Sequence, residues 1–248
     1  MDEEQPLVGG NTGAVRVGDT VRKQWSASTP SVVSFVNAVR AGGVDTPAPL
    51  GRDAQGRQVQ EFVPGQLAVD ADPLSLPQLR QVGAMVRAIH DTSEHFVPAA
   101  DAIWESDIPT PGSDLVCHND LAPWNLLVGE RLVFFDWDAA TPSTRLWDLA
   151  YSAQTFTLSD PQLEPEIAAS RLAAFVDGYG ADKPTRQALP STMYQRAATN
   201  YGMLRVWHAS GQEPLASLYL DGHGARWESA TRYVAAHQEL WADALMAR

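Results

Sequence analysis

The hydrophobic pattern of the chain changes at Pro64 and Gly65. Before this point, short β-branched or alternating runs lie between turn residues, at residues 14–17, 20–23 and 58–63. Such runs predict strands, and the first two, separated by Gly18 and Asp19, predict a hairpin. Apolar residues recur at helical spacing over residues 30–41, before two glycines, and predict one helix. Residues 50–56 are rich in turn formers.

After Pro64 the chain has longer helical patterns, which predict helices at roughly residues 76–90, 160–179, 185–210 and 224–246. One short apolar strand is expected at residues 131–135. The sequence therefore predicts an α+β protein with a strand-rich N-terminal lobe at residues 1–63 and a mainly helical C-terminal lobe at residues 64–248. The cleft between two such lobes is the default place for a ligand.

The formal charge of −12 argues against nucleic acid or an anionic membrane as a partner. No run approaches the roughly 20 apolar residues of a membrane helix, and the first residues are acidic where a secretory signal is basic. The single cysteine, Cys117, excludes internal disulfides. Together these features favour a cytoplasmic protein.

Three oxygen-bearing side chains follow one another closely at Asp120, Asn125 and Asp136. A strand-loop-strand hairpin would bring the loop that holds Asp120 and Asn125 beside the strand end that holds Asp136. Carboxylate and amide oxygens suit Mg²⁺, which in phosphate-handling sites takes one or two carboxylates. Asp120 would then remain to orient a hydroxyl nucleophile.

The segment from His118 to Asn125, followed by Asp136, resembles the catalytic loop and metal-binding aspartate of the kinase-like aminoglycoside phosphotransferase family. Residues 147–150, WDLA, and residues 16–22, RVGDTVR, are also similar to segments of family members. The resemblance covers most of residues 8–151. It implies a bilobal protein-kinase-like fold and transfer of the γ-phosphoryl group of ATP or GTP to a small-molecule hydroxyl.

By this resemblance, Asp120 would accept or orient the acceptor hydroxyl, and Asn125 and Asp136 would hold Mg²⁺. His118 would support the loop, and Asp148 would brace it by hydrogen bonds.

The same resemblance implies a nucleotide site in the N-terminal lobe. The glycines expected to let backbone N–H groups approach the phosphates are Gly9, Gly10 and Gly13. The hinge residues expected to offer backbone groups to the base are Glu61, Phe62 and Val63.

Two departures from the family pattern concern the phosphate-binding cation. The alignment places Arg22 at the strand position that is lysine in many relatives, with Lys23 next to it, and only one of the two can face the cleft. We favour Arg22, whose guanidinium also binds phosphate. The predicted helix at residues 30–41 contains no carboxylate to pair with this cation.

Several residues have a purely structural interpretation as well as a functional one. The glycine cluster also fits a plain β-turn, and Asp138 fits either a residue near the metal or a turn. His90 and His95 are expected in packing or on the surface rather than on a metal. Core packing is likewise the default for Trp207, Trp227 and Trp241.

The leading hypothesis is a small-molecule kinase acting on an antibiotic-like, amino-alcohol or sugar substrate, with a role in antibiotic resistance. The alternative is a nucleotide-binding pseudokinase that acts through a protein partner. A protein kinase is least favoured, because the segment between Asp136 and Asp148 is too short for an activation loop and peptide platform. A cationic acceptor could be received by helical-lobe carboxylates such as Asp160, Glu164, Glu166 and Asp221. The sequence selects neither the acceptor, nor ATP over GTP, nor the oligomeric state.

Overall fold

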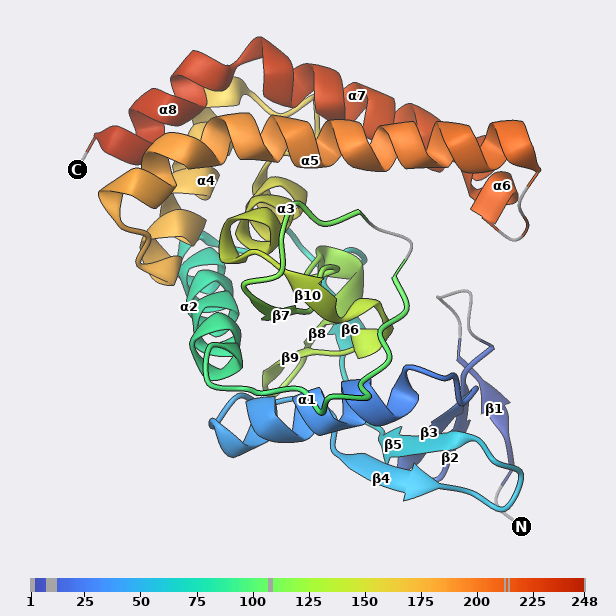
Figure 1. Ribbon diagram of the computed structural model, residues 1–248. Helices are drawn as coiled ribbons and strands as arrows, with labels where there is room; N and C mark the ends of the chain where they lie inside the picture. The colour runs from blue at the N-terminus through green and yellow to red at the C-terminus, as the bar shows by residue number, and fades with distance from the viewer. Residues whose placement is uncertain (1–2, 8–12, 107–108, 212, 214, 248) are drawn as a thin grey trace.

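The computed structural model describes residues 3–7, 13–106, 109–211, 213 and 215–247 (Figure 1). The N-terminal part contains an antiparallel sheet in the order β1-β2-β3-β5-β4. Its strands are β1 (Gln5–Pro6), β2 (Val15–Val17), β3 (Thr20–Lys23), β4 (Pro49–Arg52) and β5 (Gln58–Glu61). Helix α1 (Thr29–Ala41) lies between β3 and β4 in the chain and runs below the helical part in the view of Figure 1.

The β2–β3 hairpin confirms the expected strand pair, with Val17 opposite Thr20. Gly18 at the turn has φ +58°, which glycine adopts without a Cβ clash. Strand β4 lies where turn residues alone were expected. The pairing of β4 with β5 shifts register at Gly51, which has a positive φ. A paired strand therefore contains a residue that is typical of turns.

The C-terminal part is mainly helical and also contains two small sheets. Its longer helices are α2 (Leu76–Ser93), α3 (Arg145–Thr157), α4 (Pro165–Tyr179), α5 (Lys183–Ser210), α7 (Gly224–Ala236) and α8 (Gln238–Met246). A short helix α6 (Leu215–Leu218) and a turn of π-helix η3 (Tyr219–His223) join α5 to α7. The small sheets are β10-β7 and β6-β8-β9, with strands β6 (Gln66–Leu67), β7 (Leu115–Cys117), β8 (Leu126–Val128), β9 (Leu132–Phe134) and β10 (Thr141–Ser143).

Two features of the helical part differ from the sequence expectation. The expected helix at residues 224–246 is two helices, because the backbone leaves the helical region at His237, where φ is −123° and ψ is 26°. Helix α3 was not expected. Eleven of its residues are buried, so its sequence lacks the alternation of apolar and polar faces that predicts a surface helix.

The core joins the sheet-bearing part to the helical part. Phe35 of α1 is fully buried and meets Trp137 edge to face, with ring centroids 5.7 Å apart. Deeper in the helical part, α2 and α4 pack closely because each presents a glycine at the contact. A Cβ on Gly83 would collide with the Phe175 carbonyl, and a Cβ on Gly178 would collide with Arg80 backbone atoms. None of the helices in the described residues is long and apolar enough to cross a membrane.

Gly178→Ala should lower the free energy of unfolding by about 1–3 kcal/mol, since a rigid backbone on α2 must move away from the new methyl group. Gly202→Ala on α5 is the matched control. A Cβ there meets nothing within 4 Å, so this helical substitution should stabilise the protein by about 0.5–1 kcal/mol. Urea denaturation of both variants measures the two changes, and equal effects would contradict the close α2–α4 contact.

Candidate active site

The β8–β9 hairpin brings the two expected metal-binding residues together. Leu126 pairs with Phe134, and one step beyond this pair the Phe135 N–H donates to the Asn125 carbonyl at 3.0 Å. Asp136 follows directly and has a left-handed backbone, with φ 57° and ψ 64°. Asn125 and Asp136 therefore lie at the same end of the hairpin, as the spacing predicts.

Asp148 of α3 holds the loop that precedes this hairpin. The Asp148 side chain is fully buried, and its Oδ1 accepts the Asn119 backbone N–H at 3.0 Å. Its Oδ2 lies 3.1 Å from Nε2 of His90, whose Nδ1 lies 2.9 Å from the Tyr179 hydroxyl. Asn119 has φ +63°, an uncommon value for a non-glycine residue, so the bond from Asp148 fixes a turn that the chain would otherwise avoid.

His118 connects the loop to the strand end before Asp136. The Asp120 N–H donates to His118 Nδ1 at 3.3 Å, so Nε2 carries the proton and donates to the Phe135 carbonyl at 3.1 Å. The ring is buried and its centroid lies 4.5 Å from the Trp137 ring. Both nitrogens are thus engaged in hydrogen bonds within the loop and to the end of β9.

The Asp120 carboxylate accepts hydrogen bonds from three side chains. Asn125 Nδ2 donates to Oδ2 at 2.7 Å, while the Tyr151 hydroxyl and Trp124 Nε1 donate to Oδ1 at 2.6 and 3.3 Å. Burial raises the pKa of Asp120 above its usual value, although the hydrogen bond from Tyr151 acts in the opposite direction. A carboxyl group with this balance is suited to proton exchange.

Lys23 faces Asp136 and Asp138 from the sheet. The Lys23 ammonium lies 2.7 Å from Asp138 Oδ1 and 3.5 Å from Asp136 Oδ1. Burial alone would lower the pKa of Lys23, but the two carboxylates outweigh it and the pKa is raised. Burial raises the pKa of Asp138, with Lys23 opposing.

The preference for Arg22 as the cation that faces the cleft is wrong. The Arg22 side chain turns toward Asp53, with Nε 3.6 Å from Oδ2, while Lys23 turns toward the hairpin end. This is the strand alternation that allows only one of the two to point inward. Helix α1 has no carboxylate to pair with the cation, and Asp138 pairs with Lys23 instead.

The remaining nucleotide-site residues are only partly placed. Gly9 and Gly10 lie outside the described residues. Gly13 precedes β2 with φ +59° and has open space where a Cβ would project. At the hinge, the Glu61 N–H donates to the Ala48 carbonyl and the Phe62 N–H to the Asp19 carbonyl, both at 2.9 Å.

The residues at the hairpin end fit a hard divalent cation. Because Asn125 Nδ2 is turned to Asp120, the amide oxygen is directed away from that carboxylate, and Asp136 and Asp138 add carboxylate oxygens nearby. An all-oxygen donor set of this kind suits Mg²⁺.

A second group of possible metal-binding side chains is buried in the core of the helical part. His90, Cys117 and Asp148 have ligand atoms within 4.8 Å of one another, but all three are buried. The two ring nitrogens of His90 already bond to Tyr179 and Asp148. His95 is exposed, as expected.

Sequence reasoning missed Trp124, Tyr151 and Arg196. Arg196 of α5 is 1% exposed, donates to the Asn119 carbonyl at 3.1 Å, and lies 4.3 Å from the centroid of the Tyr151 ring. The target of this arginine lies 77 residues away in the chain, so no local pattern pointed to it.

The comparisons with known proteins agree with this geometry. Residues 94–189 match the model of the phosphotransferase enzyme family, a segment that contains Asp120, Asn125, Asp136 and Asp148. A curated relative, the trifolitoxin immunity protein of Rhizobium leguminosarum bv. trifolii, is 26% identical over 203 residues, which are 75% of this chain and 77% of the relative.

Among solved structures, amicoumacin kinase in complex with AMP-PNP, Ca²⁺ and Ami has a TM-score of 0.70 at 16% identity, covering 94% of this chain and 88% of that one. Spectinomycin phosphotransferase in complex with ADP and spectinomycin has a TM-score of 0.61 at 13% identity, covering 96% and 93%. A microcompartment-associated aminopropanol kinase has a TM-score of 0.62 at 16% identity, covering 99% and 93%.

The fold is therefore the bilobal protein-kinase-like fold, α+β, with a small sheet-bearing lobe and a larger helical one. The family match covers the segment that carries the candidate site. The expected resemblance to the aminoglycoside phosphotransferase family is confirmed by the family match over residues 94–189.

Tyr151→Phe should raise the pKa of Asp120 further, because it removes a hydrogen bond that favours the ionised carboxylate. NMR titration of the Asp120 carboxyl carbon measures this change directly. Tyr233→Phe is the control, since the Tyr233 hydroxyl donates to the Leu163 carbonyl rather than to Asp120. An unchanged or lowered pKa in Tyr151→Phe would contradict the role given to this bond.

Proposed function

We propose that this protein is a Mg²⁺-dependent small-molecule kinase that transfers the γ-phosphoryl group of ATP or GTP to a hydroxyl group. The observation that carries the proposal is the convergence of Asp120, Asn125 and Asp136 at one hairpin end, with Lys23 facing it from the sheet. Positioning and charge stabilisation are what phosphoryl transfer requires of a protein.

Asp120 would orient the acceptor hydroxyl and take its proton. In this step the hydroxyl oxygen forms a bond to the γ-phosphorus, the bond from that phosphorus to the nucleoside diphosphate oxygen breaks, and the proton passes to Asp120. Tyr151 and Trp124 hold Oδ1, and Asn125 holds Oδ2, so the carboxylate has a fixed direction before the acceptor arrives. His118 supports the loop from the side of Trp137.

Asn125 and Asp136 would hold the metal ion, with Asp138 as a further candidate. Bound Mg²⁺ supplies charge neutralisation at the β- and γ-phosphates. Lys23 would leave Asp138 to contact the phosphates, and Gly13 with the glycines before it would leave backbone room for them.

At the base, Val63 is the remaining hinge donor, because the N–H groups of Glu61 and Phe62 are bonded within the N-terminal part. We place the lobe boundary between Val63 and Pro64, where the five-stranded sheet has ended and the chain enters the helical part.

The acceptor classes of the relatives guide the choice of substrates. The names of the structural relatives refer to amicoumacin, spectinomycin and aminopropanol, and the curated relative is called an immunity protein. These names support an antibiotic-like or amino-alcohol acceptor and a role in antibiotic resistance. The pseudokinase alternative rested on the helix without a carboxylate, and Asp138 now supplies a partner for Lys23.

Asp120→Asn should lower acceptor-dependent turnover by about 10²- to 10⁴-fold, because the variant keeps the shape of the side chain but cannot take the proton. Nucleotide affinity, measured with a fluorescent nucleotide, should stay near that of the unaltered protein. Turnover within a few-fold of normal in purified Asp120→Asn would remove this assignment.

Lys23→Met should raise the KM for the Mg²⁺-nucleotide by about 10- to 100-fold, the loss expected for a charge-assisted contact. Arg22→Met is the matched control on the same strand and should leave this KM near normal, since Arg22 faces Asp53. Steady-state kinetics of both variants, with thermal melts to confirm folding, make the comparison. A larger effect in Arg22→Met would restore the original alignment.

A further inference from the structure

An aromatic cluster, with Tyr151 and Trp227 buried and Trp124 partly exposed, lies beside Asp120 on the helical side of the site. The Trp124 indole donates to Asp120, and its ring meets the Tyr151 ring edge to face at 6.3 Å. Tyr151 stacks in turn on Trp227 at 6.0 Å. Tyr201, Trp207 and Tyr219 pack against the same cluster. An acceptor whose hydroxyl reaches Asp120 therefore has aromatic rings beside it.

The long helix α5 contributes cations and no carboxylates beside this aromatic cluster. Helix α5 contains no aspartate or glutamate in its 28 residues, although the protein as a whole has a net charge of −12. Arg196 and Arg205 lie against the Tyr151 and Tyr201 rings of this cluster. The other cations of the helix, Lys183 and Arg186, lie at its opposite end beside Leu245. Of the carboxylates expected to receive a cationic acceptor, Asp160, Glu164 and Glu166 are electrostatic neighbours of Tyr233, which belongs to the other core cluster. Asp221 lies on η3, two residues after Tyr219.

Arg226 is an exposed cation beside the expected position of the acceptor. Its guanidinium lies 5.1 Å from the centroid of the Trp124 ring, the ring whose N–H contacts the Asp120 carboxylate. Arg226 is exposed and has no ion-pair partner among the described residues. A guanidinium stacked on an aromatic face keeps its N–H edge free for the two oxygens of a carboxylate.

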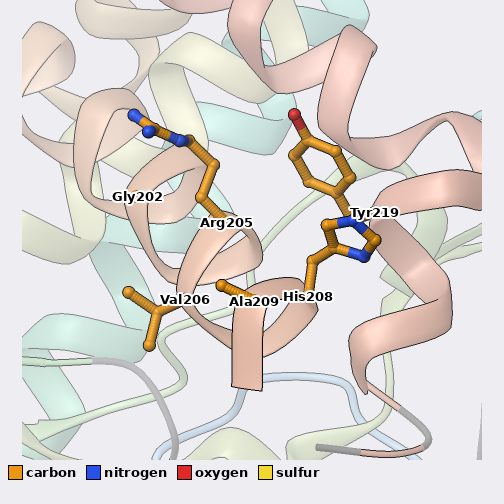
Figure 2. A pocket seen from close by; sticks show the side chains of 6 residues that line it. All are labelled: Gly202, Arg205, Val206, His208, Ala209 and Tyr219. Atoms are coloured by element: carbon orange, nitrogen blue, oxygen red, sulfur yellow. The ribbon is translucent and has the colours of Figure 1, made fainter. Parts of the chain in front are cut away.

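A hollow of about 500 Å³ adjoins the same cluster and offers room for the rest of an acceptor. It is lined by Gly202, Arg205, Val206, His208, Ala209 and Tyr219, and Figure 2 shows the Arg205 and Tyr219 side chains extending in the same direction from their helices. His208 and Tyr219 stack at 4.7 Å. The Arg205 guanidinium lies 5.7 Å from the Tyr201 ring, so the pattern of an arginine on an aromatic ring is repeated here.

We propose that the acceptor is a hydroxylated aromatic acid, and that Arg226 selects it by pairing with its carboxylate while Trp124 and its neighbours pack against its ring. This inference rests on the proposed kinase function. It assigns the acceptor a charge opposite to that of an aminoglycoside, because Arg226 beside Trp124 has no ion-pair partner among the described residues and α5 adds no carboxylate.

The test uses three probes that share a phenyl ring and an alcohol but differ in charge: 3-phenyllactate, 3-phenyl-1,2-propanediol and phenylalaninol. Binding to the full-length protein is followed by calorimetry, with and without Mg²⁺-AMP-PNP, up to millimolar concentration. 3-Phenyllactate should bind most tightly. Tighter binding of phenylalaninol, or no detectable binding of 3-phenyllactate, overturns the proposal.

Charge variants on α7 test the residue itself. Arg226→Gln should weaken 3-phenyllactate binding by about ten-fold, as expected when a charge-assisted contact is lost, and Arg226→Glu should reverse the preference toward phenylalaninol. Arg232→Gln is the matched control, because Arg232 lies on the same helix, is exposed and pairs with Glu228. Equal effects at Arg226 and Arg232 would show a general charge effect and overturn the assignment.

A separate nucleotide titration distinguishes the two levels of the argument. If Mg²⁺-AMP-PNP binds but the acid is not preferred, the acceptor proposal fails and the kinase function stands. If Mg²⁺-AMP-PNP does not bind, the kinase function fails, and the acceptor proposal falls with it.

Discussion

The buried carboxylate of Asp148 is the constraint on which the site depends. A carboxylate without solvent is tolerated only when its oxygens are hydrogen-bonded, and here one oxygen takes the Asn119 N–H and the other faces His90. The Asn119 bond holds a left-handed backbone at the turn just before Asp120. Without this hydrogen bond, nothing would offset the cost of the strained backbone that directs Asp120 toward Asn125 and Tyr151.

A second network ties the acceptor side to the catalytic loop. Arg196 reaches from α5 to the Asn119 carbonyl and stacks on Tyr151, which donates to Asp120. The helix whose far end lines the hollow of Figure 2 therefore also holds the carboxylate that would receive the hydroxyl proton. An acceptor that shifts α5 would be felt at Asp120 through packed and hydrogen-bonded groups, which are the physical means by which two sites are coupled.

The parts of the site that follow from local sequence could be predicted, and those that depend on distant contacts could not. The hairpin that joins Asn125 to Asp136 follows from strand and turn spacing alone. The choice between Lys23 and Arg22 depended on which face of β3 the helical lobe covers, and residue type pointed to the wrong one. Asp138 as the partner of Lys23 joins residues 115 positions apart, and no local pattern indicates such a pair. The aromatic cluster also depends on distant contacts, since Trp124 precedes β8 while Tyr151 and Trp227 come from α3 and α7.

The central claim is that a metal-nucleotide complex binds at the hairpin end formed by Asn125 and Asp136. Paramagnetic broadening by Mn²⁺, added with AMP-PNP to isotopically labelled protein, reports this position directly. The account predicts that the NMR signals of Asn125 and Asp136 broaden first and that those around Tyr233 remain sharp. Broadening centred elsewhere, or none at saturating nucleotide, would contradict it.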